Sequence, residues 1–262
     1  MKIAHEAPVS LLRAVESSTD FDFLISNYIM NCPEYRTLVL NRPKTRITYL
    51  DNGVFETGRA MSADDYVDII KLVRPDVYVV PDVLDDSQAT IQSFMDWSDL
   101  NPIPSGSRMG VVQGETLTDA VRCYRFMAKH ADVIGISYNS RFYEQVSEGT
   151  DYWQSMVNGR QSFIRTLHDS GEIDAGIPHH LLGCAMPLEL EQYRNAEFIR
   201  SIDTSHPISC GLEGHQYSKH GAGFKSKIKI ADILCKDVSA QQTADVMSNI
   251  ADFRSLAAEL CL

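Results

Sequence analysis

The 262-residue sequence contains no run of about 18 apolar residues, so no transmembrane helix is expected. Its first residues lack a basic segment followed by an apolar core, which argues against a signal peptide. These two absences predict a cytoplasmic protein without a membrane partner.

Several cofactor and metal motifs are also missing. There is no GxxxxGK[ST] phosphate loop and no GxGxxG after a predicted strand, so no cofactor is expected. None of the cysteines forms a CxC or CxxC pair, and we expect reduced thiols that mostly fill the core. The six cysteines are Cys32, Cys123, Cys184, Cys210, Cys235 and Cys261.

Positive charge is scarce, and the formal net charge of −11 argues against a general nucleic-acid coat protein. A nucleic-acid enzyme needs only a local basic patch. One candidate patch comprises Arg42, Lys44 and Arg46. The stronger candidate for phosphate contact, with an ordinary solvated surface as its alternative, comprises Lys219, Lys225, Lys227 and Lys229.

What is present is an alternation of short apolar runs with longer amphipathic stretches. The runs predict strands over residues 23–27, 37–41, 47–51, 77–82, 109–113, 133–137, 180–184 and 201–204. The amphipathic stretches predict helices over residues 62–73, 86–99, 116–129, 152–168, 188–199 and 240–260.

Eight strands alternating with helices predict an α/β fold, a (β/α)8 TIM-like barrel formed by a single domain over residues 1–262. The barrel is expected to be irregular at its N-terminal strands and to end in a C-terminal helix. Residues 215–235 are predicted to form a loop region on the substrate side. An open, doubly wound sheet is the main alternative.

Polar residues follow several of the predicted strands, at the barrel end where active sites lie. Three strands deliver Asp51, Asp82 and Asp203, and Gln113 follows a fourth. A single aspartate in such a place is more often a helix cap. Three of them, with an amide and nearby glycines, favour a polar pocket for a flat heterocycle that forms hydrogen bonds.

Five segments resemble tRNA-guanine transglycosylases, in the same order along the chain. LDNGVF (50–55) is similar to DSGGFQ, GVVQGE (110–115) to GIVQGG, and IGISY (134–138) to IGGLS. HLLGCAMPLEL (180–190) is similar to YLMGVGTPEDL, and IDTSHP (202–207) lies where the family has IDMFDCVxPTR. The resemblance covers roughly residues 45–215 and also implies a barrel.

The resemblance implies a catalytic pair and a base-binding set. Asp203 would be the nucleophile that attacks C1′ of the sugar, and Asp51 the general acid/base. Asp82, with Asp85 as its alternative, would bind the base edge together with Gln113 and Gly135. The other substrate-binding residues expected from these motifs are Asn52, Gly53, Gly114, Ser137 and Gly183.

The differences from the family's motifs bear on which polymer is the substrate and on whether a metal is bound. Asn52 and Val54 replace the Ser and the second Gly of DSGGFQ, and the CxCxxC…H zinc motif is absent. A zinc-free chain of this kind resembles the phage and bacterial branch that inserts 7-deazaguanine derivatives into DNA. The implied partners are DNA, or else tRNA, and a 7-deazaguanine-type free base, and a homodimer is possible by analogy. The implied compartment is the cytoplasm of a bacterium or of a phage-infected host cell.

Three other interpretations remain open: a tRNA enzyme, a base-excising glycosylase, and a non-catalytic barrel that binds nucleic acid. No metal is expected. A site built from Cys210, His206, His215 and His220 is less favoured than surface histidines near a substrate loop.

Overall fold

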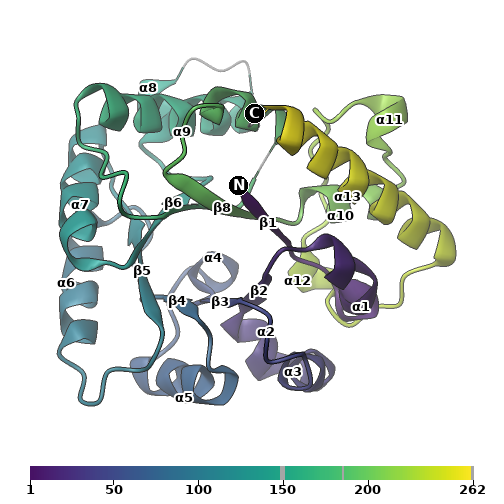
Figure 1. Ribbon diagram of the computed structural model, residues 1–262, viewed down its shortest axis with the longest axis horizontal. Coiled ribbons are helices and arrows are strands. Elements are labelled where there is room, and N and C mark those ends of the chain that lie inside the picture. The colour runs from purple at the N-terminus through teal and green to yellow at the C-terminus, as the bar shows by residue number, and fades with distance from the viewer. Residues whose placement is uncertain (148–150, 185, 261–262) are drawn as a thin grey trace.

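The chain forms a barrel of parallel strands (Figure 1). The computed structural model describes residues 1–147, 151–184 and 186–260. Within them lie β1 (Lys2–His5), β2 (Asp22–Ile25), β3 (Thr48–Asp51), β4 (Val77–Val79), β5 (Ser107–Val112), β6 (Val133–Ser137), β7 (His179–Leu182) and β8 (Ile199–Thr204). Their order in the sheet is β1-β8-β7-β6-β5-β4-β3-β2. The (β/α)8 barrel predicted from the sequence is confirmed.

The barrel is nearly closed, with its seam between β1 and β2. Within the described residues no strand pairing joins these two edges, and hydrogen bonds with the turn before β2 bridge them instead. The backbone N–H groups of Ile3 and His5 donate to Asp20 Oδ2 and Thr19 Oγ1, each at 2.8 Å. Asp20 N–H donates in return to the carbonyl of Ile3 at 2.9 Å.

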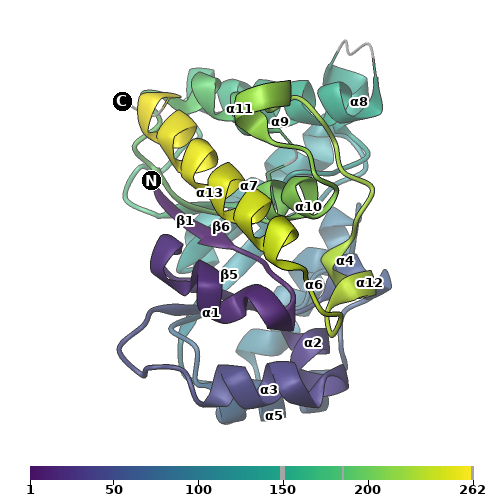
Figure 2. The same cartoon turned by 90° about the vertical axis from the view of Figure 1, so that its right-hand side faces the viewer.

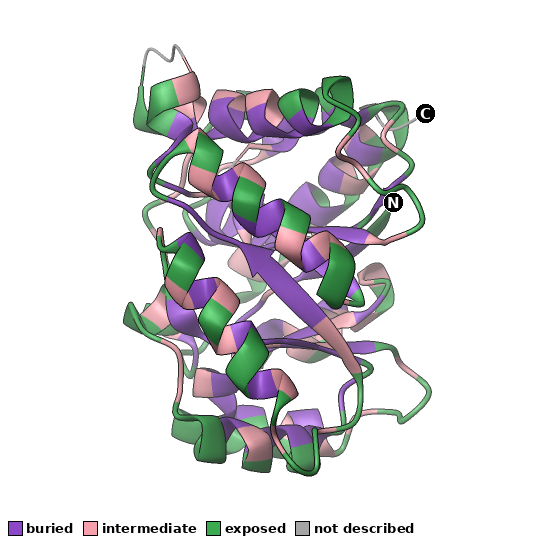
Figure 3. Ribbon diagram, turned by 90° about the vertical axis from the view of Figure 1, so that its left-hand side faces the viewer, coloured by how far each residue is buried: buried purple, intermediate pink, exposed green. Residues whose placement is uncertain are grey.

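Long amphipathic helices surround the strands and turn their buried faces inward (Figure 3). They are α5 (Ala63–Val73), α6 (Ser87–Ser98), α7 (Leu117–His130) and α9 (Tyr152–Asp169). Each begins at a side chain that accepts a hydrogen bond from the first turn, respectively Ser62, Asp86, Thr116 and Asp151. All four starts and ends lie within two residues of the predicted ones.

Shorter helices lie between the other strands and after β8. They are α1 (Leu12–Val15), α2 (Ser26–Asn31), α3 (Pro33–Leu40), α4 (Val54–Thr57), α8 (Tyr143–Val146), α10 (His206–Leu212), α11 (Tyr217–His220) and α12 (Ile230–Ile233). Three 3-10 turns, η1 (Val9–Leu11), η2 (Glu16–Ser18) and η3 (Pro187–Tyr193), complete the described elements. Helices α11 and α12 interrupt the region predicted as a loop over residues 215–235.

The last helix, α13 (Ala240–Leu260), lies diagonally across the molecule beside α10 and β1 (Figure 2). Gly211 permits the close approach of α10, because a Cβ there would lie 2.6 Å from the backbone of Val246. None of the helices in the described ranges combines the length and apolar character needed to cross a membrane.

The barrel interior is filled below the mouth by apolar side chains. Val77, Val79, Met109, Val111 and Val133 form a separate buried cluster. Because side chains alternate along a strand, these residues face inward while their sequence neighbours pack against the helices. Because apolar side chains fill the interior, the polar residues that could carry out chemistry lie at the upper end of the barrel, where the strands finish.

Two element predictions are wrong, and one strand was missed. Residues 37–41 belong mostly to α3, which begins at Pro33 and buries Tyr35 and Val39 four residues apart on one helical face. The true first strand is β1. Residues 188–199 do not form an α-helix, because η3 occupies their first half and β8 begins at Ile199.

The prediction that all cysteines are free thiols is also wrong. Cys32 and Cys235, 203 residues apart in sequence, are joined in a disulfide. Cys123, Cys184 and Cys210 are free and buried, as expected. Cys261 lies outside the described residues.

Candidate active site at the barrel mouth

Asp203 lies at the centre of the site. It is only 2% exposed, on β8, with its side chain toward the barrel interior. Asp203 Oδ1 accepts hydrogen bonds from the backbone N–H of Gly183 and from His180 Nε2, both at 3.0 Å. Two N–H donors on one oxygen stabilise negative charge on this carboxylate.

His180 is fixed from both sides. Its Nδ1 lies 2.8 Å from Ser201 Oγ, so with Nε2 donating to Asp203 the serine hydroxyl donates to Nδ1. The imidazole stacks on Phe23 with the ring centres 5.4 Å apart, and Tyr49 packs against it at 5.4 Å. The ring is therefore a rigid donor to Asp203.

Glu6 faces Asp203 from the adjacent strand. Ala4 pairs with Asp203 in the β1–β8 register, and Glu6 follows two positions later on the same inward face. The Asp203 carboxyl group lies close enough to Glu6 to oppose its ionisation. Burial, followed by the charges of Asp203 and Glu56, holds the pKa of Glu6 well above its usual range.

Asp51 and Glu56 bring two more carboxyl groups to the mouth. Asp51 Oδ1 accepts a 2.6 Å hydrogen bond from Gly53 N–H, in a turn that places Gly53 at φ +75°. Burial and then the nearby Glu56 raise the pKa of Asp51 well above its usual value. Burial also raises the pKa of Glu56, whose Oε2 has no hydrogen-bond partner in the described structure.

Asn52, Asp82 and Gln113 form a buried polar network beside these acids. Asn52 Nδ2 donates to Asp82 Oδ1 at 2.8 Å, and Gln113 Nε2 donates to Asp82 Oδ2 at 2.7 Å. Burial raises the pKa of Asp82, and the two amides oppose that rise. Each carboxylate oxygen can accept a further hydrogen bond, so this network can read donors on the edge of a ring.

A cavity of about 410 Å³ opens next to this network, between α4 and α6. Asp82 is among its lining residues, and most of the others are apolar, including Val54, Met61, Pro81 and Trp97. An apolar cavity with a few convergent polar groups is the usual form of a small-molecule site.

Four of the other predicted site residues have local structural roles. Asp85 has a φ of +59° and caps the neighbouring loop, accepting from Arg141 N–H at 2.9 Å. Gly135 faces inward, where a Cβ would lie 3.0 Å from Leu182. Gly114 packs against the backbone of α7, and Ser137 bonds within its own turn. Between Asp82 and Asp85, only Asp82 brings its carboxylate into the polar network, whereas Asp85 joins it through its backbone N–H, which donates to Gln113 Oε1 at 3.1 Å.

A buried ion pair supports the loop that carries Gly183. Arg160 on α9 forms two hydrogen bonds with Glu189 in η3, at 2.6 and 2.7 Å, and both side chains are at most 1% exposed. The guanidinium also donates to the carbonyls of Ile136, Leu182 and Gly183 at 2.9–3.3 Å. Arg160 thereby ties the ends of β6 and β7 together.

The four predicted lysines separate in the structure. Lys219, Lys227 and Lys229 are exposed, whereas Lys225 is half-buried between aromatic rings.

The histidines considered as metal ligands form hydrogen bonds within the protein instead. His206 Nε2 lies 2.8 Å from the carbonyl of Phe224, His215 Nε2 lies 2.8 Å from that of Gly221, and His220 Nδ1 accepts from Gln216 N–H.

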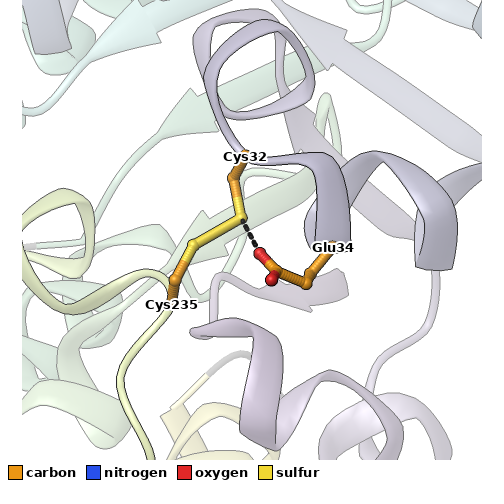
Figure 4. Close-up of side chains that lie close together, drawn as sticks. All are labelled: Cys32, Glu34 and Cys235. Carbon is orange, nitrogen blue, oxygen red and sulfur yellow. Dashed lines mark hydrogen bonds between the residues drawn. A yellow bond between two sulfur atoms is a disulfide. The ribbon is translucent and has the colours of Figure 1, made fainter.

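In the described part of the chain, one group of three side chains has metal-ligand spacing, namely Cys32, Glu34 and Cys235 (Figure 4). Its two sulfurs are joined in the disulfide, so neither is a thiolate that could bind a cation. The pair instead ties the start of α3 to the segment after α12.

Sequence reasoning missed Glu6, Glu56 and His180. Glu6 was missed together with β1, although KIAHE places a carboxylate directly after a short strand. Glu56 lies directly after the LDNGVF motif, five residues after Asp51, and the helical turn α4 directs it back to the site.

No protein-family model matches the chain, and no curated protein matches its sequence.

Proposed function

We propose that the protein is a glycosyltransferase that exchanges guanine in a nucleic acid, with DNA favoured, for a 7-deazaguanine-type base. The observation that supports this best is the geometry of Asp203, a buried carboxylate held by two N–H donors and surrounded by acids whose pKa values are raised. A nucleophile and its proton donors must differ in charge in this way.

In the first half of the proposed reaction, an Asp203 oxygen attacks C1′ of the target nucleotide. The C1′–N9 bond breaks, and its electron pair leaves with the base. Asp51, whose raised pKa favours its protonated form, donates its proton to that base. The products of this half are a covalent glycosyl ester on Asp203, free guanine and an Asp51 carboxylate.

The second half reverses these steps with the incoming base. The Asp51 carboxylate takes the proton from N9 of the 7-deazaguanine, and that nitrogen attacks C1′ and releases Asp203. In this proposal Asp82, Gln113, Asn52 and Gly53 hold the base edge. A target base in a duplex must be flipped out of the stack to reach the barrel mouth.

The test is base exchange with radiolabelled guanine or 7-cyano-7-deazaguanine and, separately, duplex DNA, single-stranded DNA and tRNA. We expect label in DNA, no label with Asp203→Asn, and a rate at least about 100-fold lower with Asp51→Asn. Asp68→Asn is the matched control, because its carboxylate is 76% exposed on α5, and it should behave as the wild type. Label in tRNA alone would change the acceptor, and release of free base without incorporation would favour a glycosylase. Full activity of Asp203→Asn would overturn the mechanism.

A further inference from the structure

A lysine lies among aromatic rings near the C-terminal ends of β6, β7 and β8. Lys225 lies in the segment between α11 and α12, Tyr138 directly follows β6, and Trp153 is in the first turn of α9. Lys225 Nζ is 4.4 Å from the centre of the Trp153 ring and 5.6 Å from that of Tyr138. Three segments that are distant in sequence thus meet around one ammonium group.

Among residues 1–147, 151–184 and 186–260, this ammonium group has no carboxylate partner. None of the ion pairs formed by the residues that the structure describes involves Lys225. Burial lowers its pKa, and the adjacent His206, whose pKa burial and Lys225 lower to about 3, stays neutral. A partly desolvated cation that lies against aromatic faces, with no carboxylate paired to it in the described structure, can bind an anion that enters the mouth.

The backbone on both sides of Lys225 is anchored. The carboxylate of Glu213 accepts hydrogen bonds from Ser226 Oγ at 2.9 Å and from the N–H groups of Lys227 and Ile228 at 2.8 and 3.1 Å. On the other side, His206 Nε2 holds the carbonyl of Phe224 at 2.8 Å. Lys225 is therefore preorganised, in contrast to a lysine on a free surface loop.

The two rings beneath Lys225 belong to a longer aromatic row. Phe55 packs against Tyr138 with ring centres 5.4 Å apart, and Tyr152 packs against Trp153 at 4.9 Å. Phe55 is 51% exposed and Tyr152 is 47% exposed, so the row presents apolar faces to solvent at both ends. Exposed aromatic faces beside a cation are the combination that binds single-stranded nucleic acid, since bases stack and phosphates pair.

The row is also connected to the acids of the site. Tyr138 packs against Gly183, where a Cβ would lie 2.5 Å from the Tyr138 ring, and the Gly183 N–H donates to Asp203 at 3.0 Å. A strand whose sugar lies over Asp203 would therefore pass its neighbouring phosphate and base along this row.

We propose that Lys225 binds a phosphate of the substrate strand next to the reacting nucleotide, while the row Phe55–Tyr138–Trp153–Tyr152 stacks on an unpaired base. This subsite rests on the proposed function, because it assigns the substrate of the same mouth as a strand with phosphates and not as a nucleoside.

The experiment measures binding without catalysis, with the purified full chain and no free base present. The probes are a short fluorescein-labelled single-stranded oligodeoxynucleotide that contains guanine, dGMP and deoxyguanosine. Lys225→Met should weaken oligonucleotide binding roughly tenfold and lower the slope of log affinity against log salt by about one. Lys129→Met, an exposed lysine at the C-terminal end of α7, removes the same charge and should change neither quantity.

Comparing dGMP with deoxyguanosine tests whether the phosphate group itself is bound, independently of the polymer. The wild type should bind dGMP about tenfold more tightly than deoxyguanosine, and Lys225→Met should bind the two equally. The wild type could also bind the oligonucleotide more tightly than dGMP by more than this factor. If Trp153→Leu then loses that preference, the polymer is identified as the ligand of the row. Intrinsic fluorescence supplies a fold control, because Trp97 is buried at 3% exposure and should keep its emission in each variant.

Unchanged affinity and salt dependence in Lys225→Met would overturn the subsite, even if base exchange proceeds normally. Conversely, binding that depends on Lys225 in a protein without base exchange would support the subsite and defeat the proposed function. The two proposals can therefore fail independently.

Discussion

The acids at the barrel mouth differ in what holds their charge. Asp203 accepts two N–H donors, whereas Glu6 and Glu56 have no described N–H donor outside their own residue and lie near other carboxyls. Like charges at close range oppose one another's ionisation in a buried site, which favours the protonated forms of Glu6 and Glu56. A carboxylate held by N–H donors among acids with raised pKa values is the arrangement that covalent chemistry at Asp203 requires.

This arrangement predicts how the stability of Glu6→Gln varies with pH. The raised pKa of Glu6 means that the folded protein holds this proton above pH 4.5, where the unfolded chain loses it. The wild type therefore loses stability as pH rises from about 4.5 through the folded pKa. An amide carries no charge, so Glu6→Gln should equal the wild type near pH 5 and exceed it by on the order of 1 kcal/mol at pH 8.

Urea unfolding at both pH values measures this difference. Glu144→Gln, exposed on α8, should show no change with pH relative to the wild type. A difference between Glu6→Gln and the wild type that is the same at pH 5 and pH 8 would contradict the raised pKa of Glu6.

At the scale of the elements, helix starts were the most predictable feature. Ser62, Asp86 and Thr116 each precede an amphipathic stretch, and each caps the helix that follows it. The apolar run over residues 37–41 misled because a short run does not distinguish a buried helical face from a strand. β1 was missed because four residues at the start of a chain carry little periodicity.

The Arg160–Glu189 pair predicts a large effect from removing one partner. Arg160→Met leaves the Glu189 carboxylate buried without its cation and should lower the free energy of unfolding by about 3–5 kcal/mol. The double variant Arg160→Met/Glu189→Met should recover most of that loss, and Arg165→Met, exposed on the same helix, should cost little. Equal losses in the double and single variants, in denaturant titrations, would assign the effect to packing alone.

The contact between β1 and α13 is predicted to make the stability of the fold sensitive to acid. His5 packs edge-on against Phe253, neither of its ring nitrogens has a hydrogen-bond partner in the described structure, and burial lowers its pKa from 6.5 to about 4. Between these values the unfolded chain binds the proton more readily, so stability falls as pH drops from 6.5 to 4, by about 3 kcal/mol from this group.

His5→Phe should remove that part of the acid dependence. Thermal unfolding between pH 4 and 7 measures it, with His168→Phe, 69% exposed on α9, as the control. If the variant and the wild type lost stability in parallel over this range, His5 would not be the titrating group.

At the scale of the whole molecule, the barrel and the strand ends that carry Asp51, Asp82, Gln113 and Asp203 could be predicted from the sequence. Alternation of strands and helices determines which end of each strand faces the site, so a residue after an apolar run can be placed there. The contacts of Glu6, Glu56, His180 and Lys225 could not be predicted, since they depend on register and on loops that fold back over the mouth.

The unpaired edges of β1 and β2 have a consequence for how the barrel moves. Ile3 and His5 donate their amide protons to side chains of a turn, and not to carbonyls of a neighbouring strand. Such bonds break when one side chain rotates, whereas a ladder such as β5–β6 opens only with its neighbours. In hydrogen–deuterium exchange, the amides of Ile3 and His5 should therefore exchange well before those of β5 and β6. The barrel would therefore open locally between β1 and β2, beside the strand that leads to Glu6.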